Sequence, residues 1–486
     1  MTERRDFIKK SILGTAGITI GGMGLGAKSY ASIIGANDRF RMAVCGVYGR
    51  GTAHIGGFGG IDNLEIAYLV DPDSKVLEKR VNELRGKTGL SANVKGVTDV
   101  RRVLEDKDID AISVATPNSW HSQMVIWAAQ SKKHCYVEKP ASHDIHEGRI
   151  ALAAAEKYGI VVQHGTQRRS EPGWARQVSD IRSGKYGKML VSHGLACKPR
   201  EGIGFQPDST PPENLDWNIW KGPAVINSYN KNLVHYNWHW NWKVGNGELN
   251  NQGTHQLDVA YWGLDAAVEN THPVRVMAIG GRFIWEDQGE TPNTMFAVAE
   301  FANGQYVFFN IRNVNYPGYK TEVTNRFYFE DGGKLVEGKY ESNNGSQPRN
   351  VPITDVRQTP GGNWASFITA CRANDPKMAN GNMFDAHYSC ALGHLMNTSY
   401  RLGKKVPFNE KAGRFGDNAL AYEEFMKIHT IARDGMGVPE NKAEYVVGPW
   451  LKFDGKTEKF VGDNSVDANK LLADPRNSGY ALTSPK

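Results

Sequence analysis

Glycines cluster directly after the first apolar run of the chain. Residues 40–46 read FRMAVCG, and residues 46–51 continue as GVYGRG. Glycine here permits a tight turn and lets backbone N–H groups approach a phosphate group at the N-terminus of a helix. The order is G-x-x-G-x-G, because Tyr48 stands where the usual G-x-G-x-x-G fingerprint has its second glycine. We expect a dinucleotide to contact this turn through Gly46, Tyr48, Gly49, Arg50 and Gly51.

An acidic residue ends the second apolar run, at residues 64–71. Asp71 lies about 20 residues after the glycines, where a carboxylate can accept hydrogen bonds from the hydroxyls of a ribose. A negative charge at this position would repel a 2′-phosphate, which favours NAD over NADP. The alternative role is a helix N-cap, and one side chain could serve both purposes.

Polar side chains also follow the next two apolar runs. TPNSWH at residues 116–121 follows the run at 109–116, and EKP at 138–140 follows the run at 134–138. Ligands bind outside the carboxyl ends of the strands in an open parallel sheet. Lys139 could be an ordinary surface lysine, but its position between an acid and a proline favours a functional role. The further cofactor contacts that we expect are Thr116, Pro117, Asn118, His121, Glu138 and Lys139.

The spacing of the apolar runs predicts two domains. Short runs that alternate with helical stretches predict a doubly wound parallel sheet covered on both faces, an α/β Rossmann domain over residues 38–165. From residue 166 the runs alternate between apolar and polar residues, which predicts an α+β domain with a large open, mostly antiparallel sheet over 166–430. Residues 431–486 are expected to form a tail that packs on the body.

The composition limits the classes of function. The chain has 486 residues, which is too long for one ordinary core, and its charged content of 23% is that of a soluble globular protein. The net charge of +6 is not concentrated in any block of like charges, so we expect no nucleic-acid partner. The five cysteines are scattered without the spacing of a zinc site, which predicts neither a metal nor a catalytic cysteine.

The N-terminus has the pattern of an export signal. Residues 4–10 read RRDFIKK, an apolar, glycine-rich run follows at 12–27, and SYA at 29–31 offers a cleavage site. A membrane anchor is the alternative, but the run is short and interrupted by glycines. We therefore expect a twin-arginine signal over residues 1–31, export to the periplasm or beyond, and no stable membrane insertion of the mature protein.

Several motifs outside the glycine turn carry a resemblance to a known family. They are EKP at 138–140, GTQRR at 165–169, KPR at 198–200, HYNWHW at 235–240, GELNNQGTHQLD at 247–258 and YRLG at 400–403. With these motifs the chain resembles the Gfo/Idh/MocA oxidoreductases, in particular a secreted bacterial subgroup with twin-arginine signals. The resemblance implies that Lys139 and His255 flank the hydroxyl group that loses hydride.

The chemistry of alcohol oxidation suits these two residue types. A group must take the O–H proton while hydride leaves to the nicotinamide, and a histidine can do so. A lysine ammonium can hold the oxygen and stabilise its developing negative charge. A purely structural helix residue is the alternative for His255. Many family members carry an aspartate where this chain has Asn251. Either His255 therefore works alone, or another residue supplies the base, or the chemistry differs.

Aromatic and polar residues alternate in the segment at 235–242, a pattern suited to stacking on sugar rings and donating hydrogen bonds. Packing in a domain interface is the alternative for Trp240 and Trp242, and surface ion pairing is the alternative for Lys198 and Arg200. The substrate contacts that we expect are Arg168, Lys198, Arg200, Tyr236, Trp238, His239, Asn251 and His255.

These observations predict an NAD(H)-dependent oxidoreductase that acts on a hydroxyl of a sugar or polyol. An exported enzyme meets no pool of free NAD, so the cofactor should be held tightly and return to its starting redox state in each turnover. One alternative is a redox-neutral glycosidase or epimerase that oxidises a ring hydroxyl transiently. A second alternative is a sugar-binding protein without catalytic activity. The open sheet could pair two subunits into a homo-oligomer.

Overall fold

The structure is a computed structural model that describes residues 39–483, apart from residues 88, 414 and 417. The expected export signal at 1–31 therefore lies outside the described residues. The fold below is that of the described residues, which lie almost entirely within the unit Arg41–Lys486. Within the described residues, no helix has the length and the apolar character that crossing a membrane requires.

The first sheet has six strands, and its pairs β1–β4, β2–β3, β4–β5 and β5–β6 are parallel. The strand order is β3-β2-β1-β4-β5-β6, so the direction of winding reverses between β1 and β4. This is the doubly wound Rossmann arrangement that the sequence predicts, and a ligand site is expected at the reversal. The strands are β1 (Phe40–Cys45), β2 (Leu64–Val70), β3 (Lys95–Val97), β4 (Ala111–Val114), β5 (His134–Val137) and β6 (Val162–His164).

Helices connect these strands and bury both faces of the sheet, which is why β2 and β4 are buried at every position. Asp73 and Asp144 cap two of the helices by accepting backbone N–H bonds in the first turn. The helices are α3 (Gly51–Gly59), α4 (Ser74–Arg85), α5 (Arg101–Leu104), α6 (Asn118–Gln130) and α7 (Ile145–Tyr158).

The second sheet has 11 strands. Its main path is β15-β14-β13-β7-β12-β11-β10-β17-β16, and off this path β18 pairs with β10 and β19 pairs with β18. Among the described strands of this sheet, only the pair of β7 and β12 is parallel. The sheet is therefore mostly antiparallel, as predicted from the sequence. The strands are β7 (Met189–Cys197), β10 (Arg275–Gly281), β11 (Thr294–Glu300), β12 (Tyr306–Arg312), β13 (Glu322–Phe329), β14 (Lys334–Val336), β15 (Lys339–Glu341), β16 (Lys404–Pro407), β17 (Glu444–Val447), β18 (Leu451–Asp454) and β19 (Lys459–Val461). A separate pair is formed by β8 (Asp208–Ser209) and β9 (Tyr229–Asn230).

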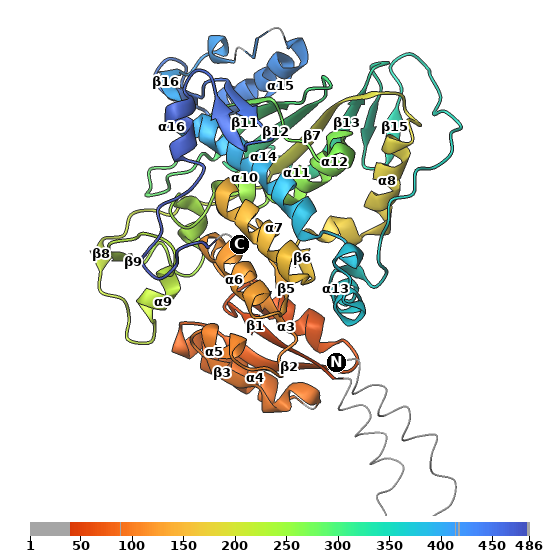
Figure 1. Cartoon of the computed structure of the whole chain (residues 1–486). Helices are drawn as coiled ribbons and strands as arrows, with labels where there is room; N and C mark the ends of the chain where they lie inside the picture. The colour runs from red at the N-terminus through yellow and green to blue at the C-terminus, as the bar shows by residue number, and fades with distance from the viewer. Residues whose placement is uncertain (1–38, 88, 414, 417, 484–486) are drawn as a thin grey trace, which may run out of the picture. The chain divides into compact units, whose positions relative to one another are not determined.

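Alternate residues of β11 belong to two different hydrophobic clusters. Met295 and Ala297 pack with α11 (Gly253–Trp262) and α14 (Met383–Arg401), whereas Phe296 and Val298 pack with α15 (Ala419–Thr430). The large sheet is therefore covered on both faces at its centre. Figure 1 shows α14 lying against α7, so that a shared helical layer joins the two sheets.

The remaining helices of the second part are shorter or lie at its edges. They are α8 (Pro172–Arg182), α9 (Trp217–Lys221), α10 (Gly247–Asn250), α12 (Ala266–Glu269), α13 (Gly362–Ala373) and α16 (Ser465–Lys470). The segment after α15 also holds β17, β18 and β19, although its polar sequence gave no sign of strands. Each of these short strands buries one or two large side chains, among them Tyr445, Phe453 and Phe460.

Candidate active site

A cleft of about 330 Å³ lies at the carboxyl ends of β1, β2, β4 and β5. Most of the residues that the sequence singles out for the cofactor line it, namely Gly46, Tyr48, Gly49, Arg50, Asp71, Thr116, Pro117, Asn118, His121, Glu138 and Lys139. Its other side comes from the second part of the chain, and the predicted substrate residues found there are Tyr236, Trp238, His239 and Asn251. The cleft thus joins both sets of predicted residues.

The glycine turn is shaped by two positions where a side chain would clash. Gly46 has a φ of +79°, and a Cβ there would lie 2.6 Å from the carbonyl oxygen of Ala115. A Cβ at Gly51, which begins α3 and does not line the cleft, would strike the carbonyl oxygen of Gly46. Gly49 has no atom within 4 Å of its Cβ position, so the backbone there is open to a ligand. The turn leaves the N-terminus of α3 free to approach a phosphate.

Asp71 stabilises this turn from the end of β2. Its carboxylate accepts from the backbone N of Val47 at 2.9 Å and of Asp73 at 3.0 Å. Burial raises the pKa of Asp71, and the two backbone N–H groups oppose that shift. The cap of α4 is Asp73, so the alternative role of Asp71 as an N-cap is wrong. Two oxygens with one protein partner each still have lone pairs for ribose hydroxyls.

Glu138 connects the glycine turn to the end of β5. Its Oε1 accepts from Arg50 Nε at 2.7 Å and lies 3.1 Å from Nε2 of His54. Burial alone would raise the pKa of Glu138, but the His54 hydrogen bond and the Arg50 charge outweigh it and hold the pKa well below its usual value. Glu138 therefore anchors Arg50 and fixes the backbone that leads into Lys139.

Lys139 reaches across the cleft to the second part of the chain. Its Nζ donates to the backbone oxygen of Asn251 at 2.8 Å and to the side-chain Oδ1 of Asn251 at 3.2 Å. An ammonium group has three N–H donors, so one remains for a ligand. Burial lowers the pKa of Lys139, whereas the charges of Glu138 and Glu248 oppose this shift.

His255 lies in the first turn of α11, one helical turn after Asn251. Burial lowers the pKa of His255 well below its usual value, and the positive charge of Lys139 lowers it further. The imidazole is therefore neutral near pH 7 and can accept a proton. His255 is not among the residues that line the cleft. The contact of Lys139 with Asn251 nevertheless brings the ammonium group to the start of the helix that carries the imidazole.

A buried acid beside Asn251 was not among the predicted site residues. Glu248 is fully buried, and its Oε1 accepts from Arg200 Nη2 at 2.9 Å. Arg200 in turn donates from Nη1 to the hydroxyl of Tyr236 at 3.0 Å. Arg200 thus approaches the cleft through Tyr236 and does not line it. The sequence signal was an acid within the GELNN segment, which by itself looks like an ordinary residue of a helical first turn.

Two predicted substrate residues lie elsewhere. Arg168 donates to Asn325 Oδ1 at 3.0 Å and to the carbonyl oxygen of Val323 at 2.8 Å, so β13 takes up its guanidinium group. Lys198 is exposed, and neither residue lines the cleft. The partners of Arg168 in β13 are close in space but more than 150 residues away in the sequence, so the local GTQRR motif does not reveal this contact.

The aromatic segment divides between the cleft and the core. Trp238 stacks on His239 with ring centroids 3.6 Å apart, and both line the cleft. Trp240 is only 5% exposed and does not line the cleft, which supports the packing alternative for this residue. His235 stacks on Tyr48 with ring centroids 4.2 Å apart, so the aromatic segment also covers the glycine turn.

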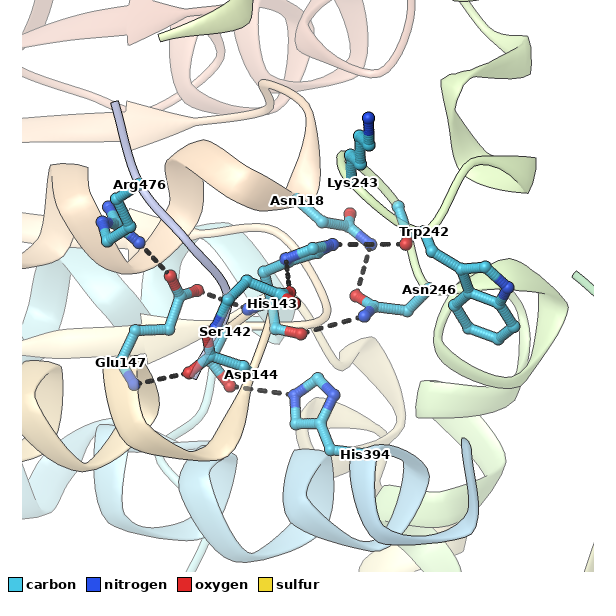
Figure 2. Close-up of polar contacts among 12 residues, drawn as sticks. Asn118, Ser142, His143, Asp144, Glu147, Trp242, Lys243, Asn246, His394 and Arg476 are labelled. Atoms are coloured by element: carbon cyan, nitrogen blue, oxygen red, sulfur yellow. Dashed lines mark hydrogen bonds and ion pairs between the residues drawn. The ribbon is translucent and has the colours of Figure 1, made fainter. Parts of the chain in front are cut away.

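The chain that follows the EKP motif is held by polar contacts from two distant segments. Figure 2 shows Asn118 donating to Asn246 at 3.1 Å and Asn246 donating to the carbonyl oxygen of His143 at 2.9 Å. It also shows Arg476, from the C-terminal segment, paired with Glu147 at 2.6 Å. These contacts fix the position of the strand end that carries the lysine.

Within the part of the chain that the structure describes, the other reactive side chains are cysteines and one cluster of possible metal ligands, and of these only Cys45 lines the cleft. The five cysteines are buried and unpaired, and none has the exposure that a nucleophile needs. Among the described residues, His272, His387 and Glu458 form a group with the spacing of metal ligands. The guanidinium group of Arg149 binds both carboxylate oxygens of Glu458, and its positive charge disfavours a cation there.

Two family models match the chain. One, described as an oxidoreductase family with an NAD-binding Rossmann fold, matches residues 40–166, and the other, described as the C-terminal alpha/beta domain of that oxidoreductase family, matches 202–431. Together they cover more than two thirds of the sequence. The chain belongs to the Gfo/Idh/MocA oxidoreductase family.

Individual relatives of this Gfo/Idh/MocA protein match over shorter stretches. The scyllo-inositol 2-dehydrogenase (NAD(+)) of Bacillus subtilis is 36% identical over 97 residues, 20% of this chain and 28% of that protein. A glycosyl hydrolase family 109 protein of Shewanella baltica is 26% identical over 214 residues, 40% of this chain and 45% of that protein. The chain therefore aligns with less than half the length of these curated relatives.

A solved structure shares the Gfo/Idh/MocA fold. It is the WlbA dehydrogenase from Bordetella pertussis, in complex with NADH and UDP-GlcNAcA, with a TM-score of 0.54 and 17% identity. The match covers 75% of this chain and 97% of that one. At this identity the similarity concerns the fold alone.

The first domain is thus an NAD-binding domain, and its residues fit that cofactor. The glycine turn leaves open backbone where a phosphate group would lie, and Asp71 offers a carboxylate to the ribose. The hydroxyl oxygen of Thr116 is buried in the cleft wall without a hydrogen-bond partner in the described structure. A buried hydroxyl of this kind is expected to be satisfied by a ligand.

Proposed function

We propose that this protein is an NAD(H)-dependent oxidoreductase that acts on a hydroxyl group of a sugar or polyol and holds its cofactor tightly. One observation carries the proposal. The ammonium group of Lys139, at the carboxyl end of β5, is bound to Asn251 at the start of the helix that bears His255. Alcohol oxidation needs an oxygen-binding cation and a neutral imidazole. Lys139 lines the cleft, and His255 lies one helical turn beyond Asn251, the residue that binds the lysine.

Each group has a defined task in this proposal. When bound, NAD supplies the acceptor for the hydride that leaves the carbon bearing the hydroxyl. The third N–H of Lys139 donates to the substrate oxygen and stabilises the negative charge that develops there, an effect worth about 10²- to 10³-fold in rate. The neutral imidazole of His255 accepts the O–H proton, which contributes about 10²- to 10⁴-fold.

The substrate side of the cleft supports a neutral, hydroxyl-rich substrate. Tyr236, Trp238 and His239 present rings and polar edges there, and the guanidinium group of Arg200 is already paired with Glu248. Aromatic rings with a few polar groups are suited to sugar recognition. One of the similar proteins is a scyllo-inositol 2-dehydrogenase (NAD(+)), and this supports a polyol or sugar as the substrate class.

Export by the twin-arginine route is part of the proposal, and the RRDFIKK segment at residues 4–10 supports it. That route carries folded proteins, so the cofactor can be loaded before export.

Two tests follow. The first is to purify the exported protein, denature it and identify the released nucleotide by absorbance and mass. We expect about one NAD or NADH per chain. Recovery of NADP, or of no nucleotide from protein that turns over sugars, would contradict the proposal.

A redox-neutral glycosidase is the second candidate, and the match to a glycosyl hydrolase family 109 protein over 40% of this chain favours it. In that reaction a ring hydroxyl is oxidised transiently to a ketone, the neighbouring C–H is acidified and the leaving group is eliminated. Water then adds to the resulting double bond, and the ketone is reduced again. The second test therefore supplies a panel of glycosides, free sugars and inositols. Release of reducing sugar without net NADH indicates the glycosidase, and oxidation of one sugar coupled to reduction of another indicates the oxidoreductase.

A further inference from the structure

A buried carboxylate lies behind the residue that holds Lys139. Glu248 is 0% exposed and sits in α10, one turn before Asn251. Its Oε2 accepts from Asn251 Nδ2 at 3.2 Å, and its Oε1 accepts from Arg200 Nη2 at 2.9 Å. A charge with no exposure is costly unless it is paired and hydrogen-bonded, and both conditions are met here.

The polarity of these hydrogen bonds determines how the Asn251 amide is oriented. A carboxylate accepts hydrogen bonds and donates none, so the NH₂ group of Asn251 must face Glu248. The opposite end of the amide, Oδ1, then faces Nζ of Lys139 at 3.2 Å. If the amide were reversed, its NH₂ group would point at the ammonium group of Lys139. Glu248 therefore determines whether Asn251 attracts the lysine or repels it.

The charge of Glu248 also acts on Lys139 directly. It favours the protonated lysine, as does Glu138, whereas burial and the charges of Arg50 and Arg200 favour the neutral amine. Three histidines also feel the lysine charge. The charged and titratable groups that face Lys139 are Glu138, Glu248, Arg50, Arg200, His121, His239 and His255.

We propose that Glu248 is a positioning residue that acts through Asn251 to aim the Lys139 ammonium group at the substrate oxygen and to keep it protonated. Asn251 carries an amide and no carboxylate, and Glu248, one helical turn earlier in the chain, supplies the carboxylate instead. This inference rests on the proposed function only for the identity of the substrate oxygen. The alternative is that Glu248 merely neutralises Arg200 within the core.

The first variant is Glu248→Gln, which removes the negative charge and nearly preserves the shape. In the proposed mechanism the protonated form of Lys139 is active, so activity falls as the pH rises through the lysine pKa. Loss of the Glu248 charge lowers that pKa. We expect the alkaline limb of the kcat profile to move to lower pH and kcat to fall about tenfold, with the KM for the sugar and the bound NAD changed less than twofold.

Asp287→Asn is the matched control. Asp287 is another almost fully buried carboxylate paired with an arginine, Arg282 at 2.6 Å, and it does not line the cleft. The Asp287→Asn variant should lose some stability and keep the wild-type pH profile of kcat. If Glu248→Gln, although folded by circular dichroism, keeps the wild-type kcat and alkaline limb, or if Asp287→Asn shifts that limb equally, the positioning role is overturned.

A double variant tests the role even if Glu248→Gln folds poorly. In Glu248→Gln/Asn251→Asp, the amide and the carboxylate exchange places. The glutamine can donate to the aspartate and accept from Arg200, and the aspartate can accept from Lys139. We expect the alkaline limb to return and kcat to recover to within about threefold of wild type. A folded double variant that is no better than Glu248→Gln would overturn the inference.

A readout without substrate separates this inference from the proposed function. The pH dependence of Lys139 acetylation, followed by mass spectrometry, reports the fraction of neutral amine. We expect the midpoint to move to lower pH in Glu248→Gln and to return in the double variant. A protein that shows this shift but oxidises no sugar would refute the proposed function and retain the role of Glu248. An unchanged acetylation midpoint in a Glu248→Gln enzyme that still oxidises sugar would refute the role of Glu248 and retain the proposed function.

Discussion

At the scale of single residues, the chemistry of the cleft depends on how two titratable groups influence each other. Burial lowers the pKa of both Lys139 and His255, and the lysine charge lowers the histidine pKa further. The protein thus keeps the imidazole neutral over a wide pH range. A neutral imidazole can accept a proton at a pH where an exposed histidine would already be largely charged.

The first prediction concerns Lys139→Met, which removes the charge and keeps the length of the side chain. We expect kcat/KM to fall about 10²- to 10³-fold, because the developing alkoxide loses its cation. The residual activity needs neutral His255 and is lost as the pH falls through the histidine pKa. Loss of the lysine charge raises that pKa, so the acid limb should move to higher pH. If the acid limb moved to lower pH, or if kcat/KM fell less than threefold, the proposed roles of Lys139 and His255 would be contradicted.

The second prediction concerns Asp71→Ser, which removes the carboxylate at the end of β2. The negative charge no longer repels a 2′-phosphate, and the ribose loses an acceptor. We expect the ratio of the Kd for NADP to the Kd for NAD to fall at least about tenfold, measured by titration of cofactor-free protein. Asp110→Asn is the control, because Asp110 precedes β4 at the opposite edge of the sheet. A ratio that is unchanged in Asp71→Ser would contradict the cofactor assignment.

At the scale of elements, the parts of the site that the sequence predicts are local. The glycine turn at 46–51 and Lys139 each follow a buried parallel strand within a few residues, and such strands leave a continuous apolar signature. The contacts that the sequence does not predict join positions far apart. Arg50 pairs with Glu138 across 88 residues, and Arg200 pairs with Glu248 across 48. Nothing in a local window distinguishes such a buried acid from an exposed one.

The short strands after α15 were missed for a related reason. β17, β18 and β19 have three or four residues each, and polar side chains alternate with the buried ones. β17 pairs with β10 and β16, β18 pairs with β10, and β19 pairs with β18. These pairings supply the hydrogen bonds that make them strands. A segment of that length has little preference of its own, so the neighbouring strands decide its structure.

Glu458, in the turn between β18 and β19, links three elements, and the third prediction tests this link. It binds Arg149 of α7, His387 of α14 and His272. Burial would raise the pKa of Glu458, but these partners hold it far below its usual value of 4.5. A carboxylate with a depressed pKa stabilises the folded state above its unfolded pKa, and that stability is lost as the pH falls below about 4.5.

We expect Glu458→Gln to lower the free energy of unfolding by about 1–2 kcal/mol at pH 7, because it leaves the partly exposed Arg149 without its charged partner. The difference between variant and wild type should shrink as the pH falls below about 4.5, because the carboxylate of the unfolded wild-type chain then takes up a proton while that of the folded protein stays charged. Urea denaturation at pH 7 and pH 4 measures both. Glu444→Gln, which breaks an exposed pair with Lys405, should cost less than about 0.5 kcal/mol. Equal losses in the two variants would show that Glu458 is an ordinary surface charge.

At the scale of the whole folded unit, the two domains meet over the cleft through side chains on both sides. Lys139 reaches Asn251, and Tyr48 stacks on His235. His235 also lies 3.1 Å from Asp73, next to the glycine turn. The contacts of the aromatic segment therefore cover the part of the cleft where the pyrophosphate is expected. In the proposed binding mode the cofactor lies beneath this stack and cannot leave until the stack opens, which would account for the proposed tight retention.

The last prediction follows from this arrangement. In Tyr48→Ala the stack with His235 is lost, and an aromatic pair of this kind is worth about 0.5–1.5 kcal/mol. We expect NAD to dissociate about two- to tenfold faster, measured by exchange with labelled NAD, because opening no longer breaks that contact. The chemical step, measured in a single turnover of preloaded enzyme, should change less than twofold, since Tyr48 does not touch Lys139 or His255 through any hydrogen bond in the described structure. Tyr422→Ala, at an exposed position of α15, is the control and should leave both rates unaltered. If Tyr48→Ala released NAD no faster than the control, retention would have to come from the deeper contacts at Asp71 and the glycine turn, and the aromatic segment would serve the substrate alone.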